Sequence, residues 1–136
     1  MRILALDPGT VRIGVAVSDE LQMIATPLEF IPAEPWADAV ARMKELLAAK
    51  EIGLIIVGMP RNMDGSFGPA AEKSREFIKA LQAETTILIR TWDERLTSKQ
   101  ASRMMSQAGR KAKDQKGRVD QAAAAVLLQS YLDSLS

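Results

Sequence analysis

The sequence predicts a single α/β domain in which a five-stranded mixed sheet carries helices on both faces. Three apolar runs of strand length come first, and later apolar runs alternate with segments of helical periodicity. A strand meander followed by such alternation is typical of a mixed sheet with helices packed on it. The chain of 136 residues is 47% hydrophobic and 26% charged. We therefore expect one domain, spanning residues 1–136, with a sizeable core.

The first three strands are expected to form the meander. Residues 3–7 and 12–18 are β-rich runs separated by Pro8-Gly9-Thr10-Val11, which predicts a hairpin. The third run, residues 24–31, contains Pro27. Because proline cannot donate a ladder hydrogen bond, this run is expected to be an edge strand.

The remainder of the chain predicts alternating helices and strands. Residues 53–58 are apolar on both faces, which is typical of a central strand covered on both sides. Thr97 and Gln100 form a capping box that opens a helix. Prolines suit the first turns of the two earlier helices. The expected helices lie at residues 35–50, from Pro69 onward, at 98–108 and at 118–135, and the further strands at 53–58 and 85–91.

The composition excludes several classes of chemistry. The chain has no cysteine and no histidine, so disulfides, thiolate or histidine zinc sites and Ser-His-Asp hydrolysis are all excluded. Any acid–base or metal chemistry must use Asp, Glu, Lys, Tyr or water. No run of about 18 apolar residues and no signal-peptide pattern occurs. We therefore expect a cytoplasmic protein with no membrane partner.

Carboxylates stand at three positions where a charge is unusual. Asp7 ends the first strand on the same side as Ile3 and Ala5, although a turn aspartate would also account for it. Asp93 and Glu94 end the last strand, and alternation alone does not decide which of them points into a site. Asp120 lies on the same helix face as an apolar stripe that must face the core, one turn before its first residue. The stripe consists of Ala124, Leu127, Leu128 and Tyr131.

Two strand ends and one helix start can bring three acids to one edge of the sheet. Close carboxylates repel one another unless a cation lies among them. Oxygen ligands without His or Cys favour hard ions, so the pattern predicts a site for Mg²⁺ or Mn²⁺. Such a site can position a water for phosphodiester cleavage.

The basic residues indicate an anionic partner. Residues 69–136 carry 12 basic and 8 acidic side chains, against 6 and 9 in residues 1–68. Residues 109–118, "GRKAKDQKGR", lead directly into Asp120, which favours nucleic acid over a merely solvated charge run. Arg61 and Asn62, in a turn-rich loop, offer donors suited to phosphate. Trp92 could stack on a base, but core packing is the favoured interpretation.

Four motifs together resemble the YqgF/RuvX family over essentially the whole chain. They are "LALDPGTVRIGVAVSD", "IIVGMPRNMDGS", "DERLTS" and "KGRVDQAAAAVLLQSYL". The resemblance implies an RNase H-like fold and a pre-16S rRNA nuclease or Holliday-junction resolvase homologue. It also implies that Asp7, Glu94 and Asp120 form the metal-binding catalytic triad, which selects Glu94 over Asp93. The expected nucleic-acid-binding residues are Arg61, Asn62, Arg95, Ser98, Arg110, Lys111, Lys113, Lys116 and Arg118.

Four functions are compatible with these residues. The first is a metal-dependent endonuclease that processes the 5′ end of pre-16S rRNA, in precursor RNA or ribosomal precursor particles. The second applies the same chemistry to branched DNA and needs a homodimer; the sequence leaves monomer and dimer open. The third is a nucleic-acid-binding module without catalysis, which the presence of all three acids disfavours. A phosphotransferase or ATPase is least favoured, because the chain is too short for the two domains that clamp a nucleotide.

Overall fold

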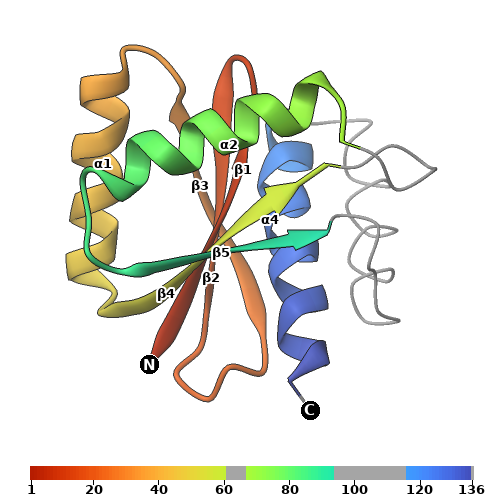
Figure 1. Ribbon diagram of the computed structural model, residues 1–136. Helices are drawn as coiled ribbons and strands as arrows, with labels where there is room; N and C mark the ends of the chain where they lie inside the picture. The colour runs from red at the N-terminus through yellow and green to blue at the C-terminus, as the bar shows by residue number, and fades with distance from the viewer. Residues whose placement is uncertain (61–66, 94–115, 136) are drawn as a thin grey trace.

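The computed structural model describes residues 1–60, 67–93 and 116–135, with the backbone alone for 116–122. The predicted helix at 98–108, with its capping residues Thr97 and Gln100, lies outside these ranges. The described elements appear in Figure 1. In chain order they are β1 (Arg2–Pro8), β2 (Arg12–Ser18), β3 (Ala25–Pro32), α1 (Trp36–Ala49), β4 (Ile52–Met59), α2 (Pro69–Gln82), β5 (Leu88–Asp93) and α4 (Lys116–Ser134).

The five strands form one mixed sheet in the order β3-β2-β1-β4-β5. The meander is antiparallel, whereas β4 pairs parallel to β1 and β5 pairs parallel to β4. β3 is an edge strand, as Pro27 predicts. The register between β2 and β3 shifts beside Pro27, where Val15 pairs with Glu29 and Ala16 pairs with Pro27. Because β1, β4 and β5 run parallel, their carboxyl ends lie at the same edge of the sheet.

One face of the sheet packs against α1 and α2. Buried side chains of α1 line up at helical spacing, with Met43 fully enclosed, and Leu81 of α2 joins them. They meet Leu4 and Leu6 of β1 and the odd-numbered side chains of β4, Ile55 and Val57. We refer to this side as the α1/α2 face.

The opposite face packs against α4 (Figure 1). The predicted stripe of Ala124, Leu127, Leu128 and Tyr131 is buried there against Ile3, Ala5, Leu54 and Ile56. We refer to this side as the α4 face. β4 is therefore covered on both sides, as its unbroken apolar sequence predicts. None of the described helices is long and apolar enough to cross a bilayer.

The predicted last strand differs from the observed one. The prediction placed it at residues 85–91, whereas β5 covers Leu88–Asp93. Thr85 and Thr86 have high β-propensity, but the Thr85 hydroxyl accepts a hydrogen bond from the Ile87 backbone N–H at 3.2 Å. Local side-chain-to-backbone bonds of this kind favour a turn over a strand. The strand therefore begins later and extends to Asp93.

Candidate active site at the carboxyl edge of the sheet

Asp7 lies near the carboxyl end of β1 and is half-buried. Side chains alternate along a strand, so Asp7 shares the α4 face with Ile3 and Ala5, as predicted. It lines a cavity of about 250 Å³ together with Gly9, Thr10, Val11 and Arg12 of the β1–β2 turn. The Asp7 carboxylate thus follows four residues whose side chains are all buried, near the carboxyl end of β1.

The turn beside Asp7 depends on Gly9. The Gly9 backbone N–H donates a 2.9 Å hydrogen bond to the Arg12 carbonyl oxygen, which closes the hairpin. A Cβ atom on Gly9 would lie 2.7 Å from that same oxygen. Any larger residue would therefore displace the backbone that forms one wall of the cavity.

Arg12 is a candidate functional residue that sequence reasoning missed. Asp7 pairs with Gly14, and Gly14 pairs with Phe30, so these positions form one row across the sheet. Residues opposite one another point to the same face, and Arg12 shares it because it is two residues from Gly14. The Arg12 guanidinium lies over the Phe30 ring, 4.8 Å from its centroid.

The side chains in this row explain how Arg12 can reach the site. Gly14, which lies between Asp7 and Phe30 in the row, has no side chain, so β2 places no side chain between these two residues. A guanidinium stacked on an aromatic ring is held in place by a cation–π interaction. Alternation places Arg12 on the same side as Asp7 only once the hairpin register, which pairs Asp7 with Gly14, is known.

The end of β5 sends neighbouring side chains to opposite faces. Trp92 lies on the α4 face, where its indole N–H donates a 3.0 Å hydrogen bond to the Ser130 hydroxyl. Its ring packs edge-on against Tyr131 with centroids 5.2 Å apart. The favoured interpretation of Trp92, core packing, is therefore confirmed.

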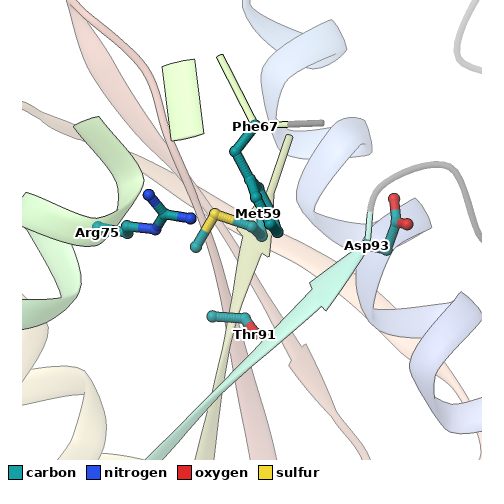
Figure 2. A pocket seen from close by; sticks show the side chains of 5 residues that line it. All are labelled: Met59, Phe67, Arg75, Thr91 and Asp93. Carbon is teal, nitrogen blue, oxygen red and sulfur yellow. The ribbon is translucent and has the colours of Figure 1, made fainter. Parts of the chain in front are cut away.

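Asp93 lies on the other side, where it lines a pocket with Met59, Phe67, Arg75 and Thr91 (Figure 2). This placement removes Asp93 from the face that carries Asp7. The sequence did not decide which side of the sheet Asp93 takes, and the contacts of the Trp92 indole on the α4 face decide it.

Gln129 fixes the position of α4 along the sheet. Its buried amide accepts a 2.9 Å hydrogen bond from the Ala25 backbone N–H and donates at 3.0 Å to the Met23 carbonyl oxygen. Ala25 pairs with Ser18, whose hydroxyl accepts a bond from the Ile3 N–H. Gln129 is therefore level with the start of β1.

The remaining predicted site residues fall outside what the structure describes in atomic detail. The backbones of Lys116, Arg118 and Asp120 belong to the first turns of α4, but their side chains are outside the described set. Glu94, Arg61, Asn62, Arg95, Ser98, Arg110, Lys111 and Lys113 lie outside the described residues altogether. Within the described set, no group of three or more acidic side chains converges. That set omits the side chains of two of the three predicted metal ligands.

Known proteins resemble this chain over nearly its whole length. The RuvX family, described as Holliday junction resolvase, matches residues 1–134. A Halothermothrix orenii protein named "Putative pre-16S rRNA nuclease" is 45% identical over 133 residues, covering 98% of this chain and 95% of that protein. A Geobacillus protein (strain WCH70) with the same name is 44% identical over 136 residues, covering 98% and 99%.

Solved structures resemble the fold. RuvC of T. thermophilus, in complex with a Holliday junction substrate, matches with a TM-score of 0.59 at 16% identity, covering 99% of this chain and 95% of RuvC. The fowlpox virus Holliday junction resolvase matches with a TM-score of 0.59 at 17% identity, over 100% of both chains. These matches confirm the predicted RNase H-like fold, and the sequence matches establish that the chain belongs to the RuvX family.

Proposed function

We propose that this protein is a divalent-metal-dependent endonuclease whose substrate is the 5′ end of pre-16S rRNA. The protein is a nuclease of the RuvX family, a hydrolase of phosphodiester bonds that binds nucleic acid. The observation that carries the mechanism is the position of Asp7, a half-buried carboxylate at the open end of a central strand. The substrate follows the name shared by relatives that are 44–45% identical.

Asp7, Glu94 and Asp120 are the proposed ligands of one or two Mg²⁺ or Mn²⁺ ions. The donor set fits a hard cation, because Asp7 offers oxygen and the chain contains no histidine or cysteine. A bound ion would polarise the phosphodiester and lower the pKa of the attacking water.

The position of α4 supports the inclusion of Asp120. Gln129 is level with Ile3, and α4 runs opposite to β1 (Figure 1). Asp120 precedes Gln129 by nine residues, about 13 Å along a helix. Asp7 follows Ile3 by four residues, also about 13 Å along a strand. The two positions therefore reach comparable levels on the α4 face.

The phase of β5 supports the inclusion of Glu94. Trp92 points to the α4 face and Asp93 to the α1/α2 face. Asp93 therefore lies away from the face that carries Asp7. This supports the choice of Glu94 over Asp93 that the family resemblance implies.

Arg12 is the described cation best placed to bind a phosphate. It lines the same cavity as Asp7 and is oriented by Phe30. A guanidinium offers five N–H donors in a planar fork that suits phosphate oxygens. The basic residues at 110–118 are proposed to bind the flanking phosphates, as the charge pattern indicates.

End-mapped digestion of labelled precursor rRNA in Mg²⁺ or Mn²⁺ tests the proposal. The wild-type chain should cut near the 5′ end of the mature rRNA, and Asp7→Asn should reduce cutting to background while leaving the circular dichroism spectrum unchanged. Cleavage by Asp7→Asn at the wild-type rate would refute the mechanism.

The second candidate is cleavage of branched DNA, which the description of the family favours. Symmetric cutting of a four-way junction needs two active sites, so a homodimer is expected in that case. Sedimentation combined with digestion of a labelled junction separates this activity from rRNA processing. A monomer that cuts precursor rRNA and leaves the junction intact would exclude this candidate. Metal-independent binding without cutting of either substrate would instead support the non-catalytic module.

A further inference from the structure

We propose that the pocket between β4, β5 and α2 binds one unpaired base of the nucleic-acid substrate, stacked on Phe67, with its phosphate on Arg75. The inference rests on the proposed function, because it adds a subsite to a nucleic-acid enzyme. We call this pocket, lined by Met59, Phe67, Arg75, Thr91 and Asp93, the Phe67 pocket (Figure 2).

The pocket presents an aromatic ring to solvent. Phe67 is 43% exposed although it is a large apolar side chain. The Arg75 guanidinium lies 4.7 Å from the centre of the Phe67 ring, and it is also ion-paired with Glu72 of the same helix. These contacts direct the guanidinium toward the ring. Bases of single-stranded nucleic acid stack on exposed rings and guanidinium planes of this kind.

The size of the pocket selects a single base. Its volume is about 240 Å³. Pockets for drug-sized ligands hold about 300–1,000 Å³, so this one suits a group as small as one nucleobase. Met59, which is almost fully buried, forms an apolar floor beside the ring. A paired base could not enter without leaving its partner.

The polar wall of the pocket favours bases that carry an amino group. Thr91 and Asp93 contribute acceptor oxygens opposite Arg75. A carboxylate accepts hydrogen bonds from the cytosine amino group and repels phosphate. The base edge is therefore expected to face Asp93, and the phosphate is expected to face Arg75 on the opposite side.

The pocket and the proposed active site use consecutive residues of the chain. Asp93 lines the pocket on the α1/α2 face, and the next residue in sequence is the proposed ligand Glu94. A nucleotide held by Phe67 would thus lie just across the sheet edge from the proposed metal site. Such a subsite would help to set which phosphodiester is cut.

Binding of short single-stranded RNA to the full chain in an Asp7→Asn background tests the inference without cleavage. Phe67→Ala should weaken binding about 10-fold, whereas Phe67→Tyr should restore it. Arg75→Gln should lower the slope of log affinity against log salt by about one. Leu88→Ala, which removes an exposed apolar side chain of β5 outside the pocket, is the matched control and should change neither quantity.

Two further readouts remain decisive if Phe67→Ala proves poorly folded. Oligocytidine should bind more tightly than oligouridine, and Asp93→Asn should reduce that preference. An oligonucleotide carrying 8-azidoadenosine should photo-crosslink to peptides containing Met59 or Phe67.

The inference would be overturned if Phe67→Ala bound as tightly as the wild type, or if crosslinks formed only with other peptides. Cleavage of rRNA by the wild type would leave the proposed function intact in that case. Failure of the wild type to bind or cut any nucleic acid would instead refute the proposed function.

Discussion

Replacing Gln129 with leucine tests how α4 is held on the sheet. The Gln129 amide is fully buried and bonds the Ala25 N–H, the Met23 carbonyl and the Asp133 carboxylate at 2.9–3.0 Å. Leucine fills much of the same volume but makes none of these bonds. The Ala25 N–H, in a residue only 4% exposed, would then lack a partner. A buried donor without a partner costs about 1–3 kcal/mol.

The other two partners are only partly buried, so water can replace the amide there at little cost. We therefore expect the free energy of unfolding to fall by about 2 kcal/mol, and Tm by about 6–8 °C for a chain of this size. Urea denaturation of the wild type and Gln129→Leu measures this difference. Gln82→Leu, at the exposed end of α2, is the control and should stay within about 0.5 kcal/mol. A Gln129→Leu variant as stable as wild type would refute the reasoning.

Three further changes test the β1–β2 turn, the phosphate contact and the β2–β3 turn. Arg12→Ala should weaken RNA binding and lower its salt slope by about one, whereas Arg42→Ala, on α1, should change neither; equal slopes for both variants would exclude a phosphate role. Gly9→Ala should lower the free energy of unfolding by about 1–3 kcal/mol, because the new methyl group meets the Arg12 carbonyl, and thermal melting will report it. Hydrogen bonds from the Ile24 and Met23 backbone N–H groups lower the pKa of Asp19 below its usual value of 3.8. The ionised carboxylate therefore stabilises the fold above that pH, and this effect is lost as the pH falls through the pKa of the folded state. Asp19→Asn should make the free energy of unfolding, measured by denaturation between about pH 5 and pH 2, fall less steeply with decreasing pH.

Sequence patterns predicted the elements whose signals are local. Pro27 alone indicated an edge strand, and the apolar stripe ending at Tyr131 indicated the buried side of α4; both are confirmed. The start of β5 was wrong, because β-propensity does not register the bond from the Ile87 N–H to the Thr85 hydroxyl. Propensity describes a residue by itself, whereas that turn depends on a contact between two residues.

In the candidate site, too, local patterns were predictable from the sequence, whereas relations that depend on contacts between residues were not. The side of β1 that carries Asp7 follows from alternation, which needs only a known strand. The side taken by Asp93 required the phase of β5, which is fixed by the contact of Trp92 with Ser130, 38 residues away. The proximity of Arg12 to Asp7 required the pairing of Asp7 with Gly14. Contacts between distant segments set these relations, and a single sequence does not display them.

The bond between Ala25 and Gln129 joins residues that are 104 positions apart. The meander that supplies Asp7 precedes α4 in the chain, so it leaves the ribosome first, and its α4 face is covered only when α4 docks. Since contacts of such long sequence separation form slowly, this face closes late in folding. A nascent chain would therefore keep this face of the sheet uncovered until α4 has left the ribosome and docked.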